Sequence, residues 1–148
     1  VTELVTGIDL IKEQIFIAAG EKLRFKQKDI QIQGHAIECR LNAENPEKNF
    51  MPCPGKIEFL HLPGGNGVRI DSAIYAGYQI PPNYDSMIAK IMVYGKDRDT
   101  AIDKMRSALG EVNVEGIITN LDYQYEIINH PVFRSGDVTT GFLEEYFK

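Results

Sequence analysis

The central part of the chain is a series of short strand-like segments separated by turns rich in proline and glycine. Strand patterns occupy residues 30–32, 35–43, 55–61, 68–74 and 86–94. Turn residues at position 46 and at 52–55, 63–67 and 81–83 separate these segments. Closely spaced strands with short turns predict an antiparallel sheet. The 86–94 segment is apolar on both faces, which is typical of a central strand.

Helical patterns precede and follow these strands. Near the start, apolar residues recur at helical spacing between Thr6, a candidate N-cap, and Gly20, a candidate C-terminal cap. Asp9 is placed to complete a shortened capping box. The apolar positions of this predicted helix are Ile8, Ile11, Ile15 and Ala19.

The last third of the chain is predicted to be helical. Asp97 is placed to cap a helix, and Asn120 is placed to cap a second one that Pro131 ends. The apolar stripes of these two helices are Ala101, Met105, Ala108 and Leu109, then Leu121, Tyr125 and Ile128. A short helix is expected from Thr140 to Phe147. The order helix, strands, helices predicts an α+β fold with the helices packed on one side of the sheet.

Composition excludes several classes of function. The net charge is −5 with acids and bases interleaved, whereas a nucleic-acid partner requires a clustered basic surface. No apolar stretch approaches the roughly 18 residues of a membrane-spanning helix. Cys39 and Cys53 fit no metal spacing and are expected to be reduced thiols in a cytoplasmic protein. His35, His61 and His130 are scattered, so we expect them to be structural and expect no metal site.

The segment GHAIECRLNAEN at residues 34–45 carries the chemically richest strand. Side chains of a strand alternate between faces, so Glu38, Arg40 and Asn42 are predicted to share one face. Ile37, Cys39 and Leu41 are predicted to share the other. An acid, a cation and an amide backed by an apolar face could form a working surface. On the residues alone, a salt bridge between Arg40 and Glu38 on a solvated face is the simpler interpretation.

Five segments, in order, resemble the C-terminal part of the biotin carboxylases, the ATP-dependent ligase components of biotin-dependent carboxylases. They are VTELVTGIDLIKEQIFIAAG, GHAIECRLNAEN, PCPGKIEFLHLPGGNGVRID, YAGYQIPPNYDSMIAKIMVYG and RDTAIDKMRSAL, followed by Ile118-Thr119-Asn120. The resemblance implies that residues 1–28 are the end of the ATP-grasp core and that residues 29–148 are the C-terminal domain. Because the chain begins with Val1 almost directly before a helix, we expect it to be cut from a larger protein.

The resemblance also implies an activity. Biotin carboxylases use ATP and bicarbonate to form carboxyphosphate and then carboxylate N1′ of biotin on a carrier domain. Arg40 matches the arginine of the family's G-H-A-x-E-C-R motif, which lies beside the bicarbonate and biotin sites. Glu38 is expected to orient its guanidinium. Asp85, in the Y-D-S-M motif, is expected either to orient active-site arginines or simply to cap the turn before the central strand.

Other positions matched by the resemblance have simpler alternatives. Thr139 and Thr140 match a region near the nucleotide pocket, although a helix N-cap is the simpler role. Arg69 matches a position near the family's homodimer interface, and a solvated arginine is the alternative. The segment 64–67 is rich in glycine but lacks the phosphate-loop pattern, and we expect a hairpin loop there.

Much of the family's machinery precedes the matched segment. The ATP-binding loop and lysines, the magnesium-binding glutamates, the general base and a second active-site arginine of the family all lie upstream of Val1. We therefore expect ATP, Mg²⁺ and carrier-bound biotin to bind the intact enzyme and none of them to bind this chain tightly by itself. The isolated chain is expected to be inactive.

The expected partners follow from the same resemblance. They are the N-terminal and ATP-grasp portions of the enzyme, a biotin carboxyl carrier domain, a carboxyltransferase and a second copy of the intact enzyme. The parent could serve acetyl-CoA carboxylase in fatty acid biosynthesis, pyruvate carboxylase or a related acyl-CoA carboxylase, as a separate subunit or within a longer chain. A competing hypothesis is a non-catalytic module for dimerisation or carrier docking. An unrelated enzyme built on Glu38, Arg40 and Asp85 is a weaker one, because no nucleophile or base with a partner is identifiable.

Overall fold

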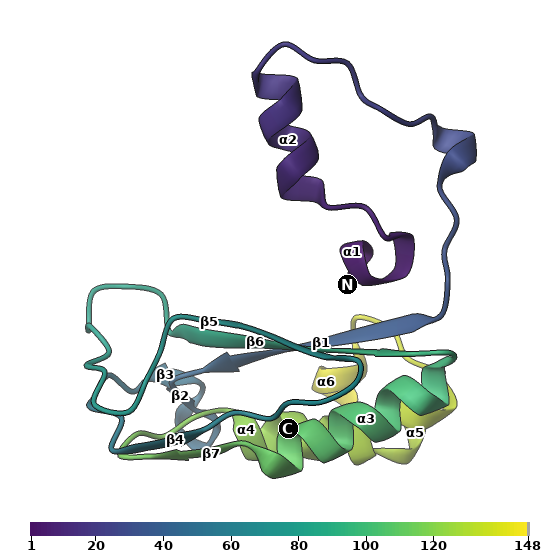
Figure 1. Cartoon of the computed structure of the whole chain (residues 1–148). Coiled ribbons are helices and arrows are strands. Elements are labelled where there is room, and N and C mark those ends of the chain that lie inside the picture. Colours follow the sequence, from purple (N-terminus) through teal and green to yellow (C-terminus); the bar gives the residue numbers. More distant parts are fainter. Residues whose placement is uncertain (148) are drawn as a thin grey trace.

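The centre of the chain is a three-stranded antiparallel sheet in the order β1 (His35–Asn42), β6 (Met87–Gly95) and β5 (Val68–Ser72). Two short ribbons accompany it: β2 (Glu44–Asn45) pairs with β3 (Met51–Pro52), and β4 (Phe59–His61) pairs with β7 (Asn113–Glu115). The structure, a computed structural model, describes residues 1–147. The predicted antiparallel sheet and its central strand are confirmed (Figure 1).

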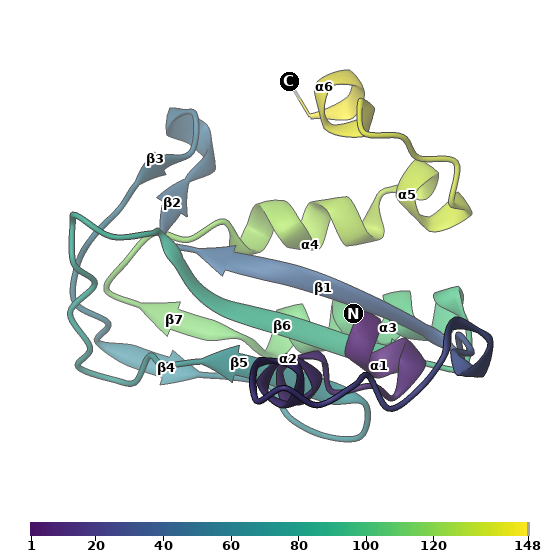
Figure 2. The same ribbon diagram turned by 90° about the horizontal axis from the view of Figure 1, so that it is seen from above.

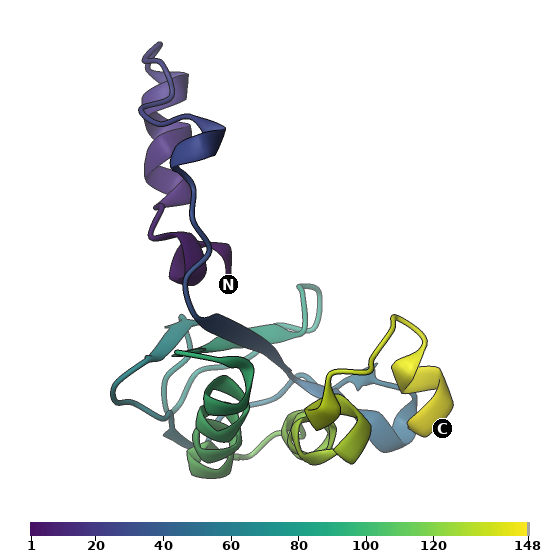
Figure 3. The same ribbon diagram turned by 90° about the vertical axis from the view of Figure 1, so that its right-hand side faces the viewer.

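The helices of the C-terminal third are α3 (Arg98–Glu111), α4 (Leu121–Asn129), α5 (Pro131–Ser135) and α6 (Phe142–Tyr146). Figures 1 and 3 show α3 and α4 on one side of the sheet. The core consists of the buried stripe of α3 and the apolar side chains of β1 and β6, including Ala101, Ile102, Met105, Leu109, Leu41, Ile91 and Val93. Full burial of each large aliphatic side chain contributes about 1.5–3 kcal/mol, so this contact holds the helices to one face. The predicted α+β fold is confirmed.

The two predicted helix caps differ. Asp97 caps α3, because its Oδ1 accepts a hydrogen bond of 2.8 Å from the Thr100 amide. The Thr100 side chain and, to a smaller extent, the Thr100 amide hold the pKa of Asp97 below its ordinary value. Asn120 occupies the cap position of α4, but its side chain makes no capping bond. Thr119 Oγ1 instead accepts from the Leu121 amide at 3.3 Å.

The Asn120 side chain bonds to the backbone of β1 instead. Its Oδ1 accepts from the Asn42 amide at 2.9 Å, and its Nδ2 donates to the Arg40 carbonyl at 3.1 Å. Asn120 is only 4% exposed. The side chain therefore fastens the start of α4 to β1, a tertiary contact that no local cap pattern predicts.

The N-terminal residues form an arm, defined here as residues 1–33, on the face of the sheet opposite α3 and α4 (Figures 1 and 3). The prediction of one helix from Thr6 to Gly20 was wrong, because Gly7 at φ 70° ends α1 (Thr2–Thr6) before α2 (Leu10–Ala18) begins. Asp9, not Thr6, caps α2 by accepting from the Lys12 amide at 2.9 Å. Gly20 follows α2 at φ 89°, as predicted for a C-terminal cap.

Two strand predictions and one loop prediction need correction. Residues 30–32 form no strand, because this connector lies away from the sheet after a 3₁₀ turn at Gln27–Asp29 and has no partner strand. Within 55–61 only Phe59–His61 joins a strand. The glycine-rich segment 64–67 is not a hairpin loop, because β4 and β5, which flank it, pair with different strands. Instead, Lys104 Nζ ties it to α3 by donating to the Asn66 carbonyl at 3.1 Å.

The end of the chain also differs in detail from the prediction. Pro131 ends α4 and also begins α5, because proline is well accommodated at the first position of a helix. The final helix begins at Phe142 rather than Thr140, and its N-cap is Gly141. Within the part of the chain that the structure describes, no helix has the length and apolar character to span a membrane.

Replacing Asn120 with alanine is expected to lower the free energy of unfolding by about 1–3 kcal/mol, because two partly buried backbone groups of β1 lose their partners. Asn113, whose exposed amide donates only to Glu115, is the matched control, and Asn113→Ala should change stability by less than about 0.5 kcal/mol. Urea unfolding of both variants measures the difference. Equal losses would contradict the proposed fastening of α4 to β1.

Candidate active-site face

The register of the sheet determines which side chains share its open face, the one opposite α3. Arg40 of β1 lies opposite Lys90 of β6, which lies opposite Asp71 of β5. One row further along, Glu38 lies opposite Met92, which lies opposite Arg69. Side chains of directly opposed residues point to the same face. The open face therefore carries Glu38, Arg40, Lys90, Arg69 and Asp71.

Arg40 lies on this face with its side chain 66% exposed. Its Nε donates to Glu38 Oε1 at 3.2 Å, so the salt bridge expected from the sequence is present. Within residues 1–147, no other hydrogen bond involves the Arg40 guanidinium. Its two terminal NH₂ groups thus remain free to bind an anion, while Glu38 limits the rotation of the side chain.

The backbone beneath Arg40 is held more firmly than a strand ladder alone would hold it. The Arg40 carbonyl and the Asn42 amide both bond to the buried Asn120 side chain. Motif matching did not single out Asn120 as a residue of the site. The signal in the sequence was its place in the Ile118-Thr119-Asn120 segment, which gives no hint of a contact 80 residues away.

Asp85 does not contact Arg40. Its Oδ1 accepts from the Met87 amide at 2.8 Å, which is the turn-capping role that the sequence left open. Asp85 does line a hollow of about 390 Å³ together with Lys90 and Asp71, and both of these residues belong to the open face. The carboxylate therefore lines a hollow that reaches the face carrying Arg40, and Lys90, a cation that the motifs did not point to, lines the same hollow.

Asn42 departs from the simple alternation of the strand. A register shift falls between Leu41 and Asn42, so the regular pairing of β1 with β6 is interrupted there. Asn42 lines a separate hollow of about 420 Å³ with residues of α4 and α6. Its Nδ2 donates to Glu44 at 3.2 Å, and its Oδ1 is buried without a partner in the described residues.

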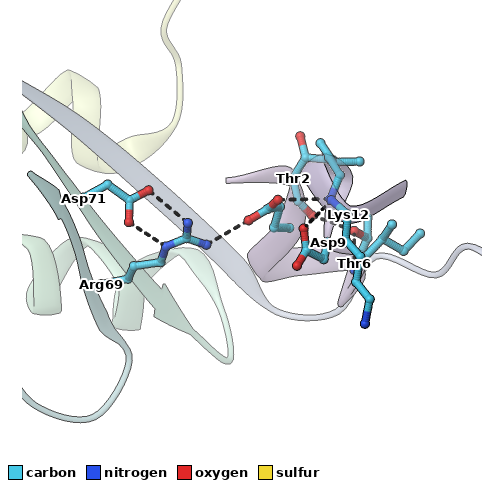
Figure 4. A network of polar contacts seen from close by, with 9 residues as sticks. Thr2, Thr6, Asp9, Lys12, Arg69 and Asp71 are labelled. Atoms are coloured by element: carbon cyan, nitrogen blue, oxygen red, sulfur yellow. Dashed lines mark hydrogen bonds and ion pairs between the residues drawn. The ribbon is translucent and has the colours of Figure 1, made fainter. Parts of the chain in front are cut away.

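Arg69 belongs to a network of ion pairs rather than to bare solvent (Figure 4). Its Nε and Nη2 donate to the two oxygens of Asp71, each at 2.9 Å, and its Nη1 donates to Glu3 at 2.8 Å. The two carboxylates raise the pKa of Arg69 above its ordinary value, Asp71 having the larger effect. Arg69 is therefore charged and doubly paired in the free chain.

The remaining candidates lie apart from Arg40 in the contact network. Thr140 is exposed in the turn before α6, where Thr139, not Thr140, accepts from the Gly141 amide at 3.2 Å. His130 caps α5, because its Nδ1 accepts from the Val132 amide at 3.3 Å, which fits the structural role predicted for it. In residues 1–147, no three histidine, cysteine or acidic side chains are grouped so as to hold a metal ion.

The other face of β1 is buried against the core. Cys39, one residue before Arg40, is 4% exposed, and this burial raises the pKa of its thiol to about 12, with a smaller contribution from Glu38. The thiol is therefore protonated and unreactive at neutral pH. The apolar side of the strand thus serves packing and leaves chemistry to the open face.

Comparison with known proteins identifies the family. The profile of the biotin carboxylase C-terminal domain matches residues 38–145. The chain is 58% identical over 146 residues to biotin carboxylase 1 of Bacillus subtilis (strain 168), covering 99% of this chain and 32% of that protein. It is 53% identical over 146 residues to a pyruvate carboxylase subunit of Methanothermobacter thermautotrophicus, covering 99% of this chain and 30% of that one. The chain therefore belongs to the biotin carboxylase family and corresponds to its C-terminal part.

Solved structures agree with this assignment. The biotin carboxylase domain dimer of Hydrogenobacter thermophilus 2-oxoglutarate carboxylase superposes with a TM-score of 0.96 at 47% identity. The match covers 99% of this chain and 32% of that one, and the crystal is a complex with MgADP, ADP and bicarbonate. The chain thus spans about a third of the length of these relatives.

A thiol-specific disulfide reagent at pH 8 is expected to modify the half-buried Cys53 and to leave Cys39 unmodified until denaturant is added. Labelling of Cys39 before denaturant is added would contradict its burial.

The raised pKa of Cys39 also predicts a pH effect. The folded chain keeps a proton that the unfolded chain loses near pH 9.0, so this contribution to stability is complete below about pH 9.0 and is lost as pH rises toward about 12. The stability difference between the wild-type chain and Cys39→Ala should shrink over that range.

Proposed function

We propose that this chain supplies Arg40 to the active site of an ATP-dependent biotin carboxylase, which carboxylates carrier-bound biotin with bicarbonate as the carbon source. The observation that carries the proposal is the Arg40 guanidinium itself. It stands on the open sheet face, oriented by Glu38 at 3.2 Å, with its remaining donors directed to no other described residue. Membership of the biotin carboxylase family supports the assignment.

The chemistry of biotin carboxylation requires such a cation. As N1′ of biotin loses its proton, negative charge develops on the ureido oxygen. A guanidinium is always protonated and presents a planar fork of donors, so it can stabilise that oxygen or hold a bicarbonate anion beside it. Charge that exists mainly in the transition state is stabilised selectively, which lowers the barrier rather than merely tightening binding.

Glu38 and Asp85 have supporting parts in this proposal. Glu38 binds Arg40 Nε and leaves the two terminal NH₂ groups for substrate. Asp85 lines the hollow beside Lys90 and in the assembled enzyme would orient arginines supplied from outside this chain, in addition to capping its own turn. Each role positions a cation and requires no proton transfer.

ATP and Mg²⁺ belong to the other part of the enzyme in this account. The described residues hold no cluster suited to a metal ion, so no metal step is assigned to them. Thr140, exposed before α6, is the residue of this chain proposed to approach the nucleotide. The complex of the Hydrogenobacter thermophilus enzyme with MgADP and bicarbonate supports these substrate classes.

Residues 1–28 are proposed to complete the ATP-grasp core. Helix α2 supports this division, because it projects from the sheet (Figure 3) and several of its apolar side chains are exposed. Ile11, Ile15 and Ile17 are 63%, 64% and 52% exposed. Exposed apolar side chains of this kind, spread around one helix, are typical of an element that packs against another part of the protein. The intact enzyme is proposed to be a homodimer that acts with a biotin carboxyl carrier domain and a carboxyltransferase.

Arg40→Ala in the intact parent enzyme is expected to lower kcat for biotin-dependent ATP hydrolysis by about 100- to 1,000-fold, because a preorganised donor at the developing charge is lost. Arg40→Lys should recover only part of the activity, since an ammonium cannot reproduce the planar fork. The matched control is Arg106→Ala on the exposed side of α3, which should leave kcat unchanged.

Sedimentation of the same variants separates catalysis from assembly. The proposal requires an unchanged mass for Arg40→Ala. A normal kcat with a reduced mass would instead support the alternative function, a non-catalytic module for dimerisation or carrier docking, which the exposed apolar side chains of α2 favour.

The isolated chain is expected to show no biotin-dependent ATP hydrolysis, because the proposal places nucleotide binding in the portion that it lacks. Mixing it with the remaining portion of the parent should generate activity that depends on Arg40. The measurement is phosphate release with and without biotin. Turnover by the chain alone would refute this division of labour.

A further inference from the structure

The carboxylate of Glu3 joins three parts of the structure. One oxygen, Oε1, accepts from the Leu10 amide at 3.0 Å, at the first residue of α2. The other, Oε2, accepts from Arg69 Nη1 at 2.8 Å. Glu3 itself lies in α1. A single side chain therefore connects α1, the start of α2 and strand β5.

The pair between Glu3 and Arg69 is the one polar contact that connects the arm to the rest of the described chain. Among residues 1–147, the Glu3–Arg69 pair is the only hydrogen bond or ion pair between the arm, residues 1–33, and the remainder of the chain. The other ion pair of the arm, between Arg24 and Glu13, stays within it. The Gln33 amide likewise bonds to Val5 inside the arm, at 2.8 Å.

Asp71 orients the Arg69 guanidinium for its contact with Glu3. Asp71 holds Nε and Nη2 of Arg69 in a two-pronged pair, which leaves Nη1 directed at the arm. An arginine whose plane is already set by one carboxylate loses little side-chain freedom when it binds a second. The direction in which Arg69 can receive the Glu3 carboxylate is therefore set by Asp71 on the sheet.

The contact lies on the face that carries Arg40. Arg69 is on β5, across Met92 from Glu38, and Glu38 orients Arg40. Helix α1 overlies one end of this face when the sheet is seen from above (Figure 2). Chain that leads into α1 therefore arrives on the same side of the sheet as the Arg40 guanidinium.

We propose that Glu3 and Arg69 form a clamp that sets the orientation of the arm, and hence of the chain preceding it in the parent enzyme, relative to Arg40. The proposal rests on the proposed function, in which the active site is assembled from both parts. Glu3 is a positioning residue here, because it acts through Arg69 and α1 and touches no substrate. The pair is partly exposed, 45% at Arg69 and 27% at Glu3, so its contribution lies in geometry more than in stability.

The test is a double-mutant cycle in the intact parent enzyme with Glu3→Gln, Arg69→Gln and the combined variant. Glutamine at position 3 still accepts from the Leu10 amide, so only the charged contact is removed. Each single variant is expected to lower kcat about three- to tenfold, and the combined variant should lose no more than the worse single one, because both remove the same contact. Losses that multiply in the combined variant, or no loss in the single ones, would overturn the clamp.

Two further measurements separate the clamp from other roles. Sedimentation should give the parent mass for all three variants; dissociation by Arg69→Gln alone would assign Arg69 to the dimer interface instead. Asp103→Asn breaks a comparable exposed pair with Arg134, at 3.1 Å between α5 and α3 on the helix side, and should leave kcat unchanged.

Failure of the clamp is distinguishable from failure of the proposed function. If Arg40→Ala abolishes turnover while the Glu3 and Arg69 variants match the wild type, only the clamp is wrong. If Arg40→Ala itself leaves turnover unchanged, the assembled site is wrong and the clamp has nothing to position.

Discussion

The pairing of β1 with β6 is the interaction on which the rest of this structure depends. Their antiparallel register, which runs from His35 opposite Gly95 to Leu41 opposite Ala89, divides the side chains of β1 between two environments. Cys39 and Leu41 enter the core beneath α3, whereas Glu38 and Arg40 face away from it. A slip of one residue would exchange the two sets and place a guanidinium in the core, so burial of the apolar set enforces the exposure of Arg40.

The backbone beneath Arg40 is held in place by residues that lie away from the open face. Asn120 bonds to the backbone on both sides of Leu41, and α3 closes the core under β6. The open face, by contrast, is held by exposed ion pairs, which are weak individually but directional. The domain thus combines a firm base for one arginine with a directional contact, through Glu3 and Arg69, to the arm that precedes it.

The sequence predicted the features that depend on local patterns. The alternation in β1, the apolar central strand β6, the Asp97 cap and the stripe of α3 were all predictable, because each reflects the period of a strand or a helix. Family motifs pointed to Arg40. The contacts between residues far apart in the sequence were not predictable. The Asn120 side chain bonds to β1 instead of capping its own helix, and Glu3 forms an ion pair with Arg69. Strand β7 pairs with β4. The partners of these polar side chains depend on which residues the fold brings together, and no periodic pattern within a single sequence reveals that.

The most direct test of the account is the accessibility of Arg40 to an arginine-specific dicarbonyl reagent, measured by mass spectrometry in this chain alone and in the intact parent enzyme. The exposed Arg106 on α3 serves as the internal reference. The account predicts that Arg40 is labelled readily in the isolated chain and is protected in the intact enzyme, where the open face meets the rest of the active site, while Arg106 reacts equally in both. Equal labelling of Arg40 in the two proteins would contradict the claim that this face completes the site.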